Sequence, residues 1–135
     1  MRRRYRSWGW EVDKRRLPSR RVGYTQKRKI GGQTLYLHTG EYEDGTLGEI
    51  FIDLDKQGSL MRSLMNCFCI AISVALQYGA SLDDLVNKFI YTKFDPSGPV
   101  QYHPNIKMAS SILDLIFKDL AITYLGRDEL KHKKG

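Results

Sequence analysis

The chain has 135 residues, of which 41% are hydrophobic, so it has the length of one domain and enough apolar residues for one core. Its longest strongly apolar run, Cys67–Leu76, is shorter than the roughly 20 residues of a membrane-spanning helix, so the sequence predicts neither a membrane protein nor contact with a membrane. Two cysteines separated by one residue are too few for a disulfide-rich secreted domain, and this favours a cytoplasmic protein.

The net charge of +7 is distributed unevenly along the chain. Residues 1–30 carry 12 Lys and Arg against 2 acids, about +10, whereas the remainder is about −3. Residues 1–22 show no helical or strand period and contain Pro18, which is typical of an extended basic arm. The arm either binds an anionic partner such as nucleic acid or is a solvated tail that docks on the acidic body. Its candidate nucleic-acid-binding residues are Arg2, Arg3, Arg4, Arg6, Arg15, Arg16, Arg20 and Arg21.

Residues 24–54 have the pattern of an antiparallel meander. Gly31-Gly32 predicts a two-residue hairpin turn between strands at 24–30 and 33–39. Asp44-Gly45 predicts a second turn before a strand at 47–54, whose apolar and polar side chains alternate.

After Gly58 the apolar period becomes helical and continues to Gly79, with Ser59 placed to cap the helix. Apolar residues nearly surround this helix, so we expect sheet, other helices or a second subunit to bury it on most sides, which favours a homo-oligomer. A second helix is expected at 82–91, a loop at 94–104 and a final helix from Ile106 to Tyr124. The predicted fold class is therefore α+β, a three-stranded antiparallel meander followed by three helices, in a domain spanning 23–130 with a polar tail at 131–135.

No set of residues predicts a catalytic or metal centre. His38, His103 and His132 follow no ligand spacing and are interpreted as ordinary surface or loop histidines. Cys67 and Cys69 would point in different directions from a helix, and we interpret them as small apolar residues and not as a redox pair. The sequence thus predicts a protein that works by binding or assembly, without a catalytic residue, metal or cofactor of its own.

The best local site is the start of the long helix. Lys56, Gly58, Ser59 and Arg62 combine a glycine, a hydroxyl and two cations where a strand leads into the helix. Helix N-termini attract phosphate through free N–H groups and the helix dipole, so these residues are a candidate nucleotide or phosphate site. A simple helix cap is the alternative.

Seven short segments carry a resemblance to a known family. They lie in order along the chain, at Arg15–Arg21, Thr39–Gly45, Leu47–Asp53, Leu76–Gly79, Phe94–Gly98, Ser111–Asp114 and Tyr124–Arg127. In these segments the chain resembles the TSCPD domain, the C-terminal region of adenosylcobalamin-dependent (class II) ribonucleotide reductases, over about residues 15–130.

The resemblance implies that this domain does not catalyse a reaction by itself. The related reductases keep their radical cysteine, redox cysteines, cobalamin and substrate sites in a preceding α/β barrel, and Cys67-Phe68-Cys69 does not match their catalytic cysteines. Adenosylcobalamin is therefore expected only in the full-length relatives. The resemblance favours a freestanding, phage-encoded nucleotide-linked binding or regulatory protein, with an accessory part of a split ribonucleoside-diphosphate reductase and a nucleic-acid-binding protein as alternatives.

Overall fold

The computed structural model describes residues 5–7 and 10–132 of the chain. Near the N-terminus, β1 (Tyr5–Ser7) and β2 (Trp10–Val12) pair antiparallel, with Tyr5 opposite Val12. The expectation of an arm without strands at residues 1–22 is therefore wrong for this segment. Strands of three residues are too short to show a period of two, which is why the sequence pattern did not reveal them.

The predicted meander is confirmed. It consists of β3 (Thr25–Ile30), β4 (Gln33–Glu41) and β5 (Leu47–Leu54), all antiparallel. Gly31 and Gly32 have φ of 52° and 86°, the left-handed values that a two-residue hairpin of this kind requires. The alternation then directs Leu35, Leu37 and Ile52 to the same buried face.

Two further strands extend the sheet where the sequence predicted a loop and the start of a helix. They are β6 (Gly98–Gln101) and β7 (Met108–Ala109), and the strand order is β5-β4-β3-β6-β7. The free edge of β3 pairs with β6 through Ile30 and Val100. Pro99 does not interrupt the pairing, because its carbonyl oxygen accepts a hydrogen bond from the Gly31 N–H at 3.1 Å.

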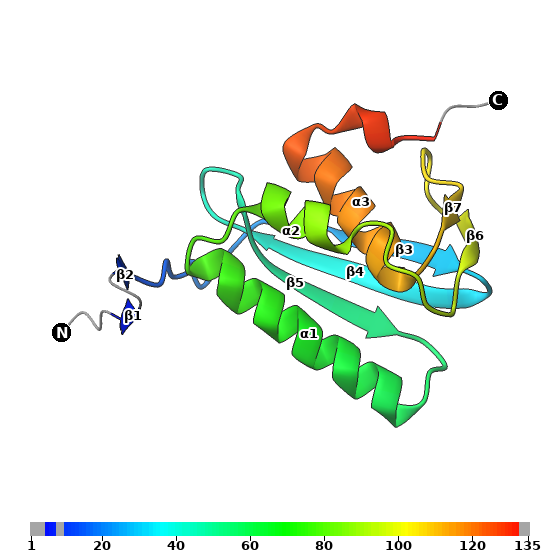
Figure 1. Ribbon diagram of the computed structural model, residues 1–135, viewed down its shortest axis with the longest axis horizontal. Coiled ribbons are helices and arrows are strands. Elements are labelled where there is room, and N and C mark those ends of the chain that lie inside the picture. The colour runs from blue at the N-terminus through cyan, green and yellow to red at the C-terminus, as the bar shows by residue number, and fades with distance from the viewer. Residues whose placement is uncertain (1–4, 8–9, 133–135) are drawn as a thin grey trace.

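Helix α1 (Ser59–Gln77) lies along the edge strand β5 (Figure 1). Gly58 is its N-cap and no side chain caps it, so the expectation that Ser59 caps the helix is wrong. At the other end Gly79 has φ 96° and takes the predicted left-handed position.

Three α1 side chains, one turn apart, satisfy the outer backbone groups of β5. The hydroxyl of Ser73 accepts from the Ile50 N–H at 3.0 Å and donates to the Ile50 carbonyl at 3.1 Å. The amide of Gln77 donates to the Gly48 carbonyl, and the Cys69 sulfur accepts from the Ile52 N–H. An edge strand normally exposes these groups, so α1 closes this edge of the sheet.

The remaining helices are α2 (Leu82–Phe89), α3 (Ile112–Leu125) and the short 3-10 helix η1 (Asp128–Leu130). Ser81 and Ser111 cap α2 and α3 by accepting from the backbone N–H three residues on. The start of α3 at Ile112 corrects the expected start at Ile106. Helix α2 ends two residues earlier than expected.

Helices α2 and α3 lie over one face of the sheet and α1 lies along its β5 edge, and the core is between these helices and the sheet (Figure 1). Phe117 and Leu120 of α3 are fully buried against this face. Helix α1 contributes only its inner side, with Met65, Cys69 and Ile72 buried, so the expectation of burial on most sides is not met within one chain. By length and composition, α1 is also apolar enough to cross a membrane, although a core helix can pass the same test.

Candidate functional site

A cavity of about 660 Å³ lies between the loop after α2, strands β6 and β7, and the start of α3. Its wall includes the aromatic and apolar side chains of Tyr91, Phe94 and Met108. Lys93 and Lys118 face it together with Asp95 and Asp114, so its ammonium and carboxylate groups balance. The cavity therefore offers no surplus charge for recognising a phosphate.

Asp114 organises the floor of this cavity. Its carboxylate accepts from the backbone N–H of Tyr91 at 2.6 Å and of Ser110 at 3.0 Å, and from Lys118 Nζ at 3.1 Å. Burial by itself raises the pKa of Asp114, but these three donors together lower the pKa below its ordinary value. Lys118 Nζ also lies 4.5 Å from the centre of the Tyr91 ring. Asp114 and Lys118 both belong to α3, and the Asp114 carboxylate holds the start of this helix to the backbone at Tyr91 and Ser110.

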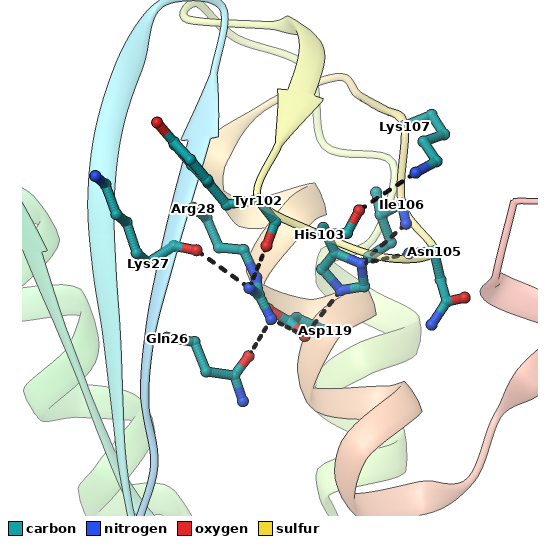
Figure 2. A network of polar contacts seen from close by, with 9 residues as sticks. All are labelled: Gln26, Lys27, Arg28, Tyr102, His103, Asn105, Ile106, Lys107 and Asp119. Carbon is teal, nitrogen blue, oxygen red and sulfur yellow. Dashed lines mark hydrogen bonds and ion pairs between the residues drawn. The ribbon is translucent and has the colours of Figure 1, made fainter.

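A second buried network joins three elements, as Figure 2 shows. Arg28 of β3 donates through Nε to Asp119 of α3 at 2.9 Å and through Nη1 to the Tyr102 carbonyl at 2.6 Å. His103 Nε2 lies 3.0 Å from the other oxygen of Asp119. Burial raises the pKa of Asp119, and the bonds from His103 and Arg28 more than offset this and lower the pKa.

The histidine in this network is held in one tautomer. His103 Nδ1 accepts from the backbone N–H of Asn105 at 3.0 Å and of Ile106 at 2.9 Å, so Nε2 carries the proton that is donated to Asp119 (Figure 2). Both ring nitrogens are occupied and the side chain is 3% exposed. His103 therefore lies in a loop, as the sequence predicted, but it is buried and does not take the surface position that the sequence allowed.

The predicted phosphate site is only partly assembled. Ser59 and Arg62 line a depression of about 280 Å³ beside β5, whereas Lys56 and Gly58 are not in its lining, and Asp53 is. No side chain caps the backbone N–H groups in the first turn of α1, and free N–H groups of this kind are what binds an anion at the start of a helix. Gly58 has φ −63°, and a Cβ there would meet nothing within 4 Å, so a glycine is not required at this position.

The second half of the basic arm lies against the body. Arg15 forms an ion pair with Asp44 at 3.0 Å and stacks over the Tyr42 ring at 3.7 Å, and Arg21 pairs with Glu49 at 3.1 Å. Arg16 and Arg20 are exposed. Arg2, Arg3 and Arg4 lie outside the described residues, and the side chain of Arg6 lies outside the described side chains.

The two cysteines are free thiols on different sides of α1, Cys67 exposed and Cys69 buried. Burial raises the pKa of Cys69 to about 12. Over the part of the chain that the structure describes, no three His, Cys, Asp or Glu side chains converge as metal ligands. His38 lies on β4 beside Thr25, and His132 Nδ1 accepts from the Lys107 N–H.

Sequence reasoning did not identify Asp114, Lys118 or Asp119 as buried charges. One signal was available, because α3 has oppositely charged residues four apart at positions 114 and 118 within a largely apolar helix. The partners in the loops, Tyr91, Ser110 and Tyr102, follow no helical or strand period and only the fold brings them together.

Comparison with known proteins gives a consistent result. The TSCPD domain profile matches residues 3–124. The chain is 52% identical over 120 residues to the vitamin B12-dependent ribonucleotide reductase of Bradyrhizobium diazoefficiens and 53% identical over 120 residues to that of Agrobacterium fabrum. These matches cover 89% of this chain but only 10% and 9% of the two reductases. The reductase of Streptomyces avermitilis is 42% identical over 112 residues, 83% of this chain and 12% of that protein. No solved structure matches the chain.

Proposed function

We propose, since the chain belongs to the TSCPD domain family, that it acts as a non-catalytic accessory domain of vitamin B12-dependent ribonucleotide reduction. The observation that carries this proposal is the match of 120 residues, at 53% identity, to 9% of a reductase. Such a segment contributes one small domain to a much larger enzyme. Its natural partner is therefore the catalytic part of such an enzyme, in the cytoplasm.

The cofactor named in the relatives does not fit the described residues. A pocket of 300–1,000 Å³ holds an ordinary drug-sized ligand, and cobalamin with its adenosyl group is several times heavier than such a ligand. The cavity beside Asp114 is about 660 Å³ and is lined by two carboxylates and two lysines, of which Asp114 and Lys118 form an ion pair. We therefore assign vitamin B12 to the catalytic part and route no step of the reaction through this chain.

The test combines this chain with the Agrobacterium fabrum reductase from which the matching segment has been removed. We expect calorimetry to detect a complex, and vitamin B12-dependent reduction of a ribonucleoside diphosphate to rise when the chain is added. The chain alone is expected to give no reduction with adenosylcobalamin and a dithiol. Turnover by the chain alone would refute the non-catalytic assignment, and absence of both a complex and a rise in activity would refute the accessory role.

A second candidate function is nucleotide binding at the start of α1. The uncapped N–H groups of the first turn favour it, with Arg62 one turn along and, among the described residues, engaged in no ion pair. With dATP as the probe, Arg62→Ala should weaken binding about ten- to a hundredfold, the effect of losing one charge-assisted hydrogen bond. Asn66→Ala, in the same depression but without charge, is the control. Equal affinity of wild type and Arg62→Ala would leave the segment as a helix start only.

Nucleic-acid binding through the arm is a further alternative. Arg16 and Arg20 are exposed and face solvent, whereas Arg15 and Arg21 are engaged with the body. If the arm binds DNA, the affinity for a duplex should fall steeply as the salt concentration rises. The logarithm of the association constant should fall by about 0.9 for each tenfold increase in salt and each phosphate neutralised. A salt-independent affinity, or none, would argue against this alternative.

A further inference from the structure

The outer side of α1, which faces away from β5, carries four large apolar side chains that are exposed. Leu60 is 73% exposed, Leu64 58%, Ile70 55% and Val74 41%. All four lie opposite the buried side of the helix, and Arg62 is the only charged residue among the nineteen of α1. We call these four residues, with Ser63, Cys67 and Ala71 between them, the outer α1 face.

The order of residues on this face is symmetric about Cys67. Leu60 and Val74 each lie seven residues from Cys67, and Leu64 and Ile70 each lie three residues from it. Ser63 and Ala71, four residues away on either side, are small. In an antiparallel copy related by a two-fold axis at Cys67, Leu64 would therefore face Ala71 and Ile70 would face Ser63, each large side chain against a small one.

We propose that two copies of the chain pair through their outer α1 faces, antiparallel, with the two Cys67 side chains at the two-fold axis. A two-fold interface uses the same surface on both partners and must complement itself. Small residues at every fourth position form a row along which two helices can approach closely, with the larger side chains interlocking on either side. This inference does not depend on the proposed role in ribonucleotide reduction.

A membrane fits these observations less well than a second copy. A spanning α1 would have to leave β5, which would uncover the strand edge that Ser73 and Gln77 satisfy. A helix lying on a membrane usually carries several cations beside its apolar face, and α1 has only Arg62. An unrelated protein partner would not require the face to be symmetric about Cys67.

The expected dimer is dissociable. The face from Leu60 to Val74 extends about 21 Å at 1.5 Å per residue. Two such faces with four large and three small side chains each would bury roughly 1,000 Å² in total, near the lower limit for a specific interface. We therefore expect monomer and dimer to exchange at micromolar concentrations.

The first test measures the mass of the full chain by sedimentation at about 5 to 100 μM with a reductant present. Wild type should shift from monomer to dimer over this range. Leu64→Glu, which places a carboxylate against Ala71 in the apolar face of the other copy, should stay monomeric. Val22→Glu is the matched control, since Val22 is a 68% exposed apolar residue away from α1 and should leave the dimer unchanged. Ala71→Arg is a second disrupting variant, and circular dichroism verifies that each variant is folded.

The second test uses the cysteine at the axis. Copper(II) phenanthroline should oxidise two Cys67 thiols to one intermolecular disulfide, with the two protons released and the two electrons taken up by the reagent. The cross-link should disappear in Cys67→Ser and fall at least tenfold in Leu64→Glu. A wild-type monomer at 100 μM, a dimer that persists in both disrupting variants, or binding of the monomer to lipid vesicles through this face would each overturn the proposal.

Discussion

Replacing Asp119 by Asn tests whether the buried network of Figure 2 stabilises the fold. The substitution keeps the shape of the side chain and removes its charge, which leaves Arg28, only 13% exposed, without its buried counter-ion. Removing one partner of a buried ion pair costs about 3–5 kcal/mol, and the amide oxygen of Asn still accepts one hydrogen bond. We therefore expect a loss of about 3 kcal/mol in the free energy of unfolding at pH 7.

The effect should depend on pH in a defined direction. The pKa of Asp119 lies below its ordinary value of 3.8, because the donors from His103 and Arg28 outweigh the effect of burial. Stability from this carboxylate is therefore present above about pH 4 and is lost as the pH falls through the folded-state pKa. The difference between wild type and Asp119→Asn should narrow below pH 4.

Urea denaturation followed by circular dichroism at pH 7 and at pH 3.5 measures both effects. Asp53→Asn is the matched control, since Asp53 is an exposed acid on β5 and should change the free energy by less than about 0.5 kcal/mol. A double substitution with Arg28→Met should recover part of the loss, because it removes the uncompensated cation. An Asp119→Asn variant within 0.5 kcal/mol of wild type at pH 7 would refute the assigned role.

Three further predictions concern the other contacts of the fold. Lys118→Met should lower the free energy of unfolding by about 1–3 kcal/mol in urea titrations, because Asp114 stays buried without its cation. Ser73→Ala should cost about 1–2 kcal/mol and accelerate hydrogen exchange at the Ile50 amide, and unchanged exchange there would contradict the closed strand edge. Iodoacetamide at pH 8 should label Cys67 and spare Cys69, whose pKa burial raises to about 12, as peptide mass spectrometry can verify.

The parts of the fold that could be predicted from the sequence are those with a strong local signal. Gly31-Gly32 can hold the left-handed backbone of a tight hairpin, so the meander follows from it and from the alternation in β4 and β5. The capping serine of α2 and Gly79 at the end of α1 could be predicted for the same reason, because residues nearby in the sequence determine each of them. The family resemblance also follows from contiguous segments, and the matching profile confirms it.

The parts that could not be predicted depend on contacts between distant segments. Strands β6 and β7 have four and two residues, and they form because β3 offers a free edge. Ile106 and Ala109 happen to continue the helical spacing of α3 backwards, which made the predicted helix too long. For the candidate site, Asp119 needs partners from β3 and from the loop before β7, and these lie 91 and 16 residues away in the sequence.

The two sides of α1 limit how this domain can associate. On its inner side Cys69, Ser73 and Gln77 occupy the backbone groups of β5, so no strand of another chain can add to that edge without displacing the helix. Its outer side is apolar and, among the described residues, uncovered, and a domain that makes up about a tenth of its relatives' length has reason to expose such a surface. Association through helix packing rather than strand addition is therefore the expectation, whether the partner is a second copy or the catalytic part of a reductase.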